Sequence, residues 1–326
     1  MTERIGIICG MEQSFPAAFV EKVNSIPGFS CELASFGGIN ETHKPDFRVL
    51  VDRISHEVPY YRIFLKTAAL AGTYVINDPF WWSADDKFFG YTLAARLGVR
   101  VPRTVLLPQH SYAPAINPQR SLRNLEYPLD WEAIVDYVKF PAILKPAEGG
   151  GWKHVSLVHN LNELWTAYNQ SGALAMTLQE FIDFDDYVRC LCIGKEYILP
   201  IKYDPKRRCY EDAESFLSKD LEKTVLDDAW ALNHALGYDM NSVEFAIKDG
   251  VAYAIDFTNP APDFDVHSIL PKYFRLAVDQ MANLVTRAAK EGRRNNSGYS
   301  FRKYLDKPAP RPLSSVDPKS SSRKLG

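Results

Sequence analysis

Hydrophobic and polar positions along the first 80 residues follow two periods in turn, one typical of strands and one typical of helices. The expected strands are residues 4–9, 47–52 and 73–76, and the expected helices are residues 16–23 and 60–71. This order favours parallel pairing, so we predict a small Rossmann-like layer over residues 1–80. The turn after the first strand, Gly10-Met11-Glu12-Gln13-Ser14, lacks the G-x-G-x-x-G pattern, which argues against a dinucleotide site there.

The rest of the chain mixes helices and strands, which predicts an α/β (α+β) fold. Capping residues mark the helix starts: Ser83 to Asp86, Asp130, Ser218, and a capping box of Asn160 with Glu163. The expected helices are residues 83–97, 130–138, 160–168, 218–236 and 271–289. The expected strands are residues 104–107, 142–145, 176–181, 188–193 and 197–202, followed by a hairpin over 242–257. The turn-rich residues 109–129 read as a surface insertion.

Composition and charge exclude several classes of protein. Hydrophobic residues make up 46% of the chain, and 38 Lys+Arg against 40 Asp+Glu give a net charge of −2, which favours neither nucleic acid nor an anionic membrane as partner. No apolar run reaches the roughly 18 residues of a membrane span, and the apolar start reads as a strand, not a signal peptide. The 5 cysteines fit no zinc spacing. We therefore expect a reduced, cytoplasmic setting.

Residues 293–326 change composition to Pro, Ser and basic residues. From Lys307 onward this tail carries five basic residues and one acid, Asp317. We predict that it is disordered, with a basic docking arm as the alternative.

The hairpin over 242–257 carries the most informative pattern. Side chains alternate faces along a strand, so the parity of the residue number sorts them. The odd positions predict an apolar core face, made of Val243, Phe245, Ile247, Val251, Tyr253 and Ile255. The even positions place Glu244 and Asp256 among alanines on the other face.

Two acids on one strand face favour a bound cation, because strand interiors are depleted of acids. Asn259, just beyond the second strand, adds an oxygen ligand of the kind Mg²⁺ accepts. A half-exposed sheet with solvated acids is the alternative. An odd-length turn at Lys248-Asp249-Gly250 would bring both carboxylates to one side, facing Lys145. Without metal the two carboxylates would repel, so Asp256→Asn would leave the melting temperature unchanged or higher.

A cationic constellation accompanies the acids. Lys145 ends a strand directly before Glu148-Gly149-Gly150-Gly151, and Lys87 lies in the first turn of a helix. Glycines let backbone N–H groups approach phosphates, and a lysine at the strand end neutralises them. A flexible surface loop and a solvated lysine explain these residues equally well when each is taken alone.

The order of these pieces resembles the ATP-grasp superfamily, and within it the glutathione-synthetase-like and RimK-like carboxylate–amine ligases. The resemblance covers about residues 73–290. It rests on Asp86-Lys87, then Gly98-Val99-Arg100-Val101-Pro102-Arg103-Thr104, then Phe140 to Pro146 with the glycine loop, then Gln179-Glu180-Phe181-Ile182, then Glu244, Asp256 and Asn259. It implies an ATP-grasp fold over residues 81–292, preceded by a pre-ATP-grasp domain over 1–80. Within the fold it implies a lid subdomain over 103–178 and a subdomain with hinge and metal site over 179–292.

The resemblance also implies roles for individual residues. The ATP-binding residues would be Lys87, Lys145, Gly149, Gly150, Gly151, Gln179, Glu180, Phe181 and Ile182, with Asp186 among the acids near the ribose. Glu244, Asp256 and Asn259 would hold Mg²⁺, as two ions, with Mn²⁺ as a substitute. Arg189 and Lys202 would contact the γ-phosphate or substrate as catalytic residues.

The chain departs from the family pattern at several places, and one of them is the glycine loop, where Trp152 and His154 replace glycines. The second metal strand runs Asp256-Phe257-Thr258-Asn259, one residue longer than the usual acid-x-Asn. Ser242 stands where an arginine is common, and Pro260-Ala261-Pro262-Asp263 replaces a glycine-containing stretch. The nucleotide end therefore matches the family better than the substrate end.

The implied reaction is ATP-dependent joining of a carboxylate to an amine through an acyl phosphate, with lysines and Mg²⁺ offsetting the repulsion between two anions. Four polar residues after the strand at 47–52 would bind the carboxylate: Arg53, Ser55, His56 and Arg62. Surface polar residues are an equally good account of these four. A small-molecule kinase and a non-catalytic ATP-binding regulator are the alternative functions. The partners would be small molecules, and a homodimer is left open.

Overall fold

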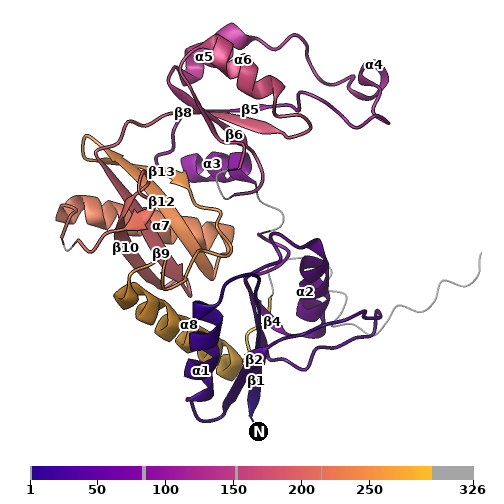
Figure 1. The fold of residues 1–326 in the computed structure, drawn as a ribbon, viewed down its shortest axis with the longest axis vertical. Coiled ribbons are helices and arrows are strands. Elements are labelled where there is room, and N and C mark those ends of the chain that lie inside the picture. Colours follow the sequence, from indigo (N-terminus) through magenta and orange to yellow (C-terminus); the bar gives the residue numbers. More distant parts are fainter. Residues whose placement is uncertain (1, 83–85, 151–152, 214, 296–326) are drawn as a thin grey trace, which may run out of the picture. The chain divides into compact units, whose positions relative to one another are not determined.

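The computed structural model describes residues 2–82, 86–150, 153–213 and 215–295 (Figure 1). These residues form three sheets. Among the described helices, none combines the length and the apolar character needed to cross a membrane. Asn295, at the end of this range, is buried and bonds through its side chain to the backbone N–H and carbonyl of Val75. The anchored chain thus extends past residue 293, and the rest of the predicted tail, 296–326, lies outside the described residues.

The N-terminal sheet is parallel, as predicted, with the order β2-β1-β3-β4. Its strands are β1 (Glu3–Ile8), β2 (Phe29–Leu33), β3 (Val49–Asp52) and β4 (Tyr74–Ile76), and its helices are α1 (Ser14–Asn24) and α2 (Pro59–Ala71). Phe15, Phe19 and Val23 of α1 pack on one face, and Phe64 and Leu65 of α2 pack on the other. The sequence prediction missed β2, because its alternating, half-exposed residues contain no apolar run.

The central sheet is antiparallel, with the order β5-β8-β6-β7. It contains β5 (Thr104–Leu107), β6 (Ala142–Pro146), β7 (Ser156–Val158) and β8 (Met176–Glu180). Two helices, α5 (Trp131–Val138) and α6 (Leu161–Asn169), cover one face, and α4 (Pro118–Ser121) lies in the predicted insertion. The other face keeps Lys145 and Gln179 available for the cavity described below. The three-residue strand β7 was not predicted.

The largest sheet has the order β11-β10-β9-β12-β13, and all its pairs are antiparallel. Its strands are β9 (Asp186–Ile193), β10 (Tyr197–Asp204), β11 (Cys209–Tyr210), β12 (Met240–Lys248) and β13 (Val251–Asp256). Helix α7 (Lys219–Leu236) packs on one face, and α8 (Pro271–Glu291) packs on the other together with the N-terminal layer. Helix α3 (Lys87–Arg96) packs against the hairpin through Tyr91 and Ala94.

Helix caps follow the sequence closely. The carboxylate of Asp86 accepts from the Phe89 N–H at 2.7 Å, and that of Asp130 accepts from the Ala133 N–H at 2.9 Å. Ser218 caps α7, and Asn160 with Glu163 forms the predicted box at α6. These signals are local, which explains why the sequence located them correctly.

The turn of the β12–β13 hairpin differs from the prediction. Lys248 pairs with Val251 around a two-residue turn, Asp249-Gly250, whose φ angles of 51° and 73° are those of a type I′ turn. The expected odd-length turn is therefore wrong. With this register Phe245 lies opposite Ala254, so Ala252 and Ala254 complete the core face of the hairpin.

The core face predicted for the second strand is consequently wrong as well. Val251, Tyr253 and Ile255 are half-buried on the opposite side. A register shift then follows: Phe245 pairs with Ala254, but Glu244 pairs with Asp256. Ile255 is thus the extra residue of a β-bulge, and the bulge returns Asp256 to the side of Glu244. The two acids share a side, as expected, but through a bulge and not through the turn.

Candidate active site

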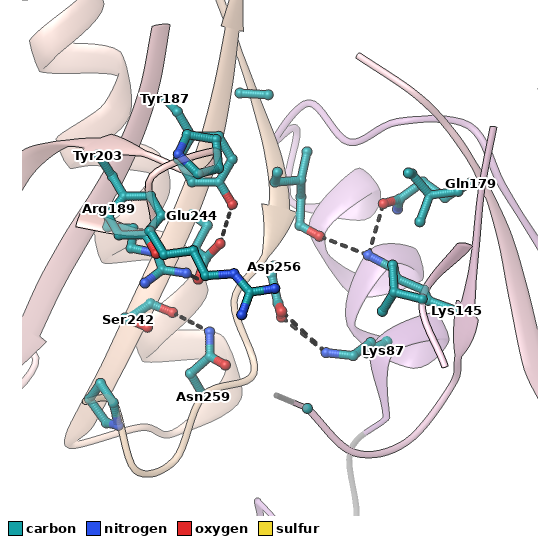
Figure 2. Close-up of a pocket in the computed structure, with 18 of the residues that line it drawn as sticks. Lys87, Lys145, Gln179, Tyr187, Arg189, Tyr203, Ser242, Glu244, Asp256 and Asn259 are labelled. Atoms are coloured by element: carbon teal, nitrogen blue, oxygen red, sulfur yellow. Dashed lines mark hydrogen bonds and ion pairs between the residues drawn. The ribbon is translucent and has the colours of Figure 1, made fainter. Parts of the chain in front are cut away.

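A cavity of about 590 Å³ lies between the central sheet and the largest sheet. It brings together twelve of the residues singled out from the sequence: Lys87, Lys145, Gly149, Gly150, Gln179, Glu180, Phe181, Ile182, Arg189, Glu244, Asp256 and Asn259. Figure 2 shows Glu244 and Asn259 on the hairpin side, Lys87 and Lys145 on the opposite side, and Asp256 between them. Gly151 lies outside the described residues.

Each carboxylate of the acidic pair has its own cation. Glu244 forms an ion pair with Arg189 at 2.9 Å and accepts a hydrogen bond from the Tyr187 hydroxyl. Asp256 accepts from the Lys87 ammonium at 3.2 and 3.3 Å. Burial raises the pKa of Glu244, and Arg189 offsets part of that effect. Burial alone would raise the pKa of Asp256 too, but Lys87 and Lys145 together lower it.

This pairing corrects the expectation that the two acids simply repel in the absence of metal. Removing the charge of Asp256 would leave Lys87, whose side chain is 10% exposed, without its carboxylate. Loss of one member of a buried ion pair is destabilising. Asp256→Asn is therefore expected to lower the melting temperature of the metal-free protein.

The donor set suits a hard divalent cation. The side-chain N–H of Asn259 donates to the Ser242 carbonyl at 3.0 Å, which leaves its amide oxygen as a potential ligand. Its backbone N–H donates to the Asn241 side chain at 3.0 Å, so the residue is fixed at both ends. Among the described residues no three His, Cys, Asp or Glu side chains cluster as a metal site. Two carboxylates with one amide oxygen, completed by water and phosphate, are a set that Mg²⁺ accepts.

Lys145 is held in a fixed direction at the end of β6. Its ammonium donates to the Tyr91 hydroxyl at 2.8 Å, to the Gln179 side chain at 2.9 Å and to the Ile255 carbonyl at 3.2 Å. Burial lowers its pKa, while Asp256 and Glu244 act in the opposite direction. Figure 2 shows Lys145 and Gln179 joined in this way across neighbouring strands.

The segment after β8 forms the other end of the cavity. The Glu180 carboxylate accepts two hydrogen bonds from the Arg103 guanidinium, at 2.8 and 3.0 Å. These bonds lower the pKa of Glu180, because their effect is larger than the opposite effect of burial. The N–H groups of Glu180 and Phe181 donate to the carbonyls of Arg103 and Pro141. Phe181 and Ile182 line the cavity with apolar surface.

Two predicted residues of β9 and β10 lie outside the lining. Asp186 and Lys202 form an ion pair with each other at 2.9 Å, and Lys202 also lies 4.0 Å from Glu211. Neither is among the residues that line the cavity. The hydrogen bond to Asp186 raises the pKa of Lys202.

The four residues predicted to bind a carboxylate also lie outside the lining. Arg53 is buried and donates to both oxygens of Glu12 and to the Pro262 carbonyl at 2.5 Å. The Ser55 hydroxyl donates to Asp52, and the Arg62 guanidinium stacks on Trp82 at 5.2 Å. His56 is partly buried, which lowers its pKa.

Sequence reasoning missed the aromatic side chains beside the acids. Tyr187, Tyr203 and Tyr210 line the cavity, and Arg189 stacks on Tyr203 at 3.7 Å (Figure 2). A signal for Tyr187 was present, since it stands two residues before Arg189 and a strand places both on one face. Tyr91 carried no signal, because its role depends on contacts with Lys145 and Ile255, far away in the sequence.

The loop after Asn259 forms another part of the cavity wall. Ala261, Pro262 and Asp263 line the cavity together with Ser242 and Ser268. Pro260 and Pro262 carry no N–H, and the N–H of Asn259 is already bonded to Asn241.

Similar solved structures establish the architecture. The D-alanine–D-alanine ligase of Bacillus anthracis, solved in complex with ATP, aligns with a TM-score of 0.61 and 15% identity over 89% of this chain and 98% of that one. A RimK domain protein ATP-grasp from Sphaerobacter thermophilus aligns with a TM-score of 0.60 and 15% identity, over 87% and 99% of the two chains. The chain has the ATP-grasp fold.

Sequence comparison adds two relatives with partial coverage, and no family model matches. The chain is 26% identical over 191 residues to a D-alanine–D-alanine ligase of Polynucleobacter asymbioticus, which covers 51% of this chain and 56% of that protein. It is 29% identical over 135 residues to a formate-dependent phosphoribosylglycinamide formyltransferase of Prochlorococcus marinus, covering 36% and 34%. The ATP-grasp chain therefore spans about half of the first relative's length and a third of the second's.

Proposed function

We propose that this ATP-grasp protein is an ATP-dependent ligase that joins a carboxylate to an amine through an acyl phosphate and releases ADP and phosphate. The observation that carries the proposal is the meeting of Glu244, Asp256 and Asn259 with Lys87 and Lys145 in one cavity. These residues come from three separate parts of the chain. Acids and lysines in this combination suit the binding of a nucleotide triphosphate with divalent metal.

In this proposal, the basic residues bind the phosphates and the acidic residues bind the metal. Lys87 and Lys145 would neutralise phosphate oxygens, and the N–H groups around Gly149 and Gly150 would approach them closely. Mg²⁺, or Mn²⁺ in its place, would be held by Glu244, Asp256 and Asn259 and would offset the charge of the phosphates. Phe181 and Ile182 would contact the base. The phosphate end of the nucleotide would thus lie against the lysines.

Arg189 would act at the reacting end. Its guanidinium lies between Glu244 and the ring of Tyr203, and its buried Nε has no partner among the described residues. Arg189 as a whole lines the cavity, and a guanidinium on the cavity wall suits an anion that arrives with the substrates. We assign this position to the carboxylate or to the phosphoryl group in transfer.

Hydroxylamine trapping tests the proposal. The purified protein is incubated with Mg-ATP, a panel of carboxylates, and hydroxylamine in place of the amine. A ligase produces ADP together with a hydroxamate that depends on the correct acid, because hydroxylamine captures an acyl phosphate.

Two other outcomes would contradict the ligase assignment. ADP with a stable phosphorylated product and no hydroxamate would show a small-molecule kinase. Nucleotide binding without any ADP across the panel would favour a non-catalytic regulator. Either result overturns the ligase assignment.

A further inference from the structure

We propose that Tyr91 is a positioning residue, and that its hydroxyl holds the β13 bulge and Lys145 in the arrangement that the metal and phosphate contacts require. This inference rests on the proposed nucleotide site. Tyr91 does not line the cavity itself. It acts through two groups that do, Lys145 and the Ile255–Asp256 segment.

The bulge needs a partner for its carbonyl. Ile255 is the residue that the β12–β13 register skips, so it is left out of the ladder between the two strands. A buried carbonyl without a donor costs about 1–3 kcal/mol. Here the Ile255 carbonyl accepts from the Tyr91 hydroxyl at 2.7 Å and from the Lys145 ammonium at 3.2 Å. These two donors come from outside the hairpin and stabilise the bulge.

The bulge in turn decides where Asp256 points. Side chains alternate along β13, so loss of the extra residue would turn Asp256 to the opposite face of the hairpin. That face is the apolar core around Phe245 and Ala254. The donors on the Ile255 carbonyl therefore help to keep Asp256 beside Glu244.

The Tyr91 hydroxyl serves Lys145 at the same time. The hydroxyl donates to the Ile255 carbonyl and accepts from the Lys145 ammonium at 2.8 Å. It therefore acts as donor and acceptor at once. Burial raises the pKa of Tyr91 above its ordinary value, which keeps the hydroxyl protonated. Phenylalanine could fill the same space but could neither donate nor accept.

Helix α3 positions Tyr91 next to the Ile255 carbonyl of β13. Lys87 and Tyr91 are four residues apart, so they lie on one face of the helix, and both reach β13. Gly90 between them permits close approach, since a Cβ there would lie 3.1 Å from the Phe257 ring. The Tyr91 ring meets the Phe257 ring edge-on, with centroids 5.5 Å apart. One helix face therefore supports both the charge and the geometry of Asp256.

The test compares Tyr91→Phe with Tyr74→Phe. Tyr74 is likewise buried, and its hydroxyl donates to Asp239, away from the cavity. Mn²⁺ is the probe: protein is titrated into Mn²⁺ with ATP, and binding is followed by the enhanced relaxation of water protons, because ATP alone already removes the free-ion EPR signal. ATP binding in EDTA is measured separately. Tyr91→Phe should weaken Mn²⁺ binding about tenfold, whereas Tyr74→Phe should leave it within about twofold, even if both variants melt earlier.

Three results are informative. If Tyr91→Phe binds Mn²⁺ with ATP as tightly as the unmodified protein does, the positioning role is wrong. If Tyr74→Phe weakens Mn²⁺ binding equally, the effect reflects general destabilisation and the proposal also falls. If the unmodified protein binds no Mn²⁺ with ATP, the proposed nucleotide site itself is wrong, which is a different failure.

Discussion

Two polar clusters could be proposed from the sequence, and the structure treats them differently. One follows β3 in the N-terminal layer and contains Arg53, Ser55, His56 and Arg62. The other combines the β12–β13 hairpin with Lys87 and Lys145. In the first cluster the polar groups bond mainly to neighbours within the fold; in the second they gather around one cavity.

The two clusters differ in the groups to which their polar side chains bond. Arg53 is satisfied by Glu12 and by a backbone carbonyl, and the hydroxyl of Ser55 is satisfied by Asp52. In the hairpin cluster, the acids are matched by cations from α3 and β9. Under the proposed function, Mg²⁺ would replace these cations beside the acids, and phosphate would replace the acids beside the lysines. Polar residues at a strand end are thus insufficient evidence for a ligand. Charges whose partners a ligand can substitute are better evidence.

The largest expected effect is on turnover at the hairpin cluster. Asp256→Asn should lower ADP formation by about 10²–10³-fold or more, because a charged ligand next to the phosphates is lost. Steady-state ADP release under saturating ATP measures it. Asp186→Asn, at an acid outside the cavity lining, is the control and should keep activity within a few-fold. An equal loss of ADP formation in both variants would contradict the prediction that Asp256, and not Asp186, lies next to the phosphates.

A second expected effect is on stability at the N-terminal cluster. Arg53→Met should lower the free energy of unfolding by about 3 kcal/mol, because Glu12 is left partly buried without its partner and the Arg53 side chain is only 2% exposed. Lys223→Met, at an exposed helix pair with Asp227, should cost less than about 0.5 kcal/mol. Urea unfolding measures both.

Arg53→Met also tests whether Arg53 has a structural role or binds the substrate carboxylate. With Arg53 in a structural role, the KM for the carboxylate should stay within a few-fold at temperatures where the variant is folded. Unchanged stability together with a large rise in that KM would place Arg53 at the substrate, and the comparison between the clusters would fail.

The smallest expected effect concerns His56 and pH. Burial lowers its pKa, so the unfolded chain binds the proton more readily and stability falls as pH drops below the ordinary imidazole value, about 6.5. His56→Gln should narrow the difference in melting temperature between pH 7.5 and pH 5.5 slightly, since the ring is partly exposed. Thermal melts at both pH values measure it. An unchanged or wider difference would contradict the burial argument.

Local signals allowed much of the fold to be predicted from the sequence. The caps at Asp86, Asp130 and Ser218 depend on residues three positions apart, and the parallel N-terminal layer follows from the alternation of apolar runs. Short or half-exposed strands such as β2, β7 and β11 were missed, because few of their residues are apolar and buried.

The candidate site was predictable in its residue types but not in its geometry. The parity argument placed Glu244 and Asp256 together, yet it assumed an odd-length turn where the chain has a two-residue turn and a bulge. A bulge has no signature in these few residues, because contacts from Tyr91 and Lys145 support it. The bond from Arg53 to Pro262 spans 209 positions, which no local pattern reports.

The two prolines after Asn259 limit how many backbone hydrogen bonds residues 259–263, the loop at the rim of the cavity, can donate to an anion. Over residues 259–263 the backbone offers at most the N–H groups of Ala261 and Asp263, since one N–H is occupied and two are missing. A rim with so few backbone donors relies on side chains for anion binding. A residue such as Ser268 is then expected to accept single substitutions that change substrate preference without altering the course of the main chain. Specificity at this end of the cavity is therefore expected to be encoded in side-chain identity, where it is easy to redesign.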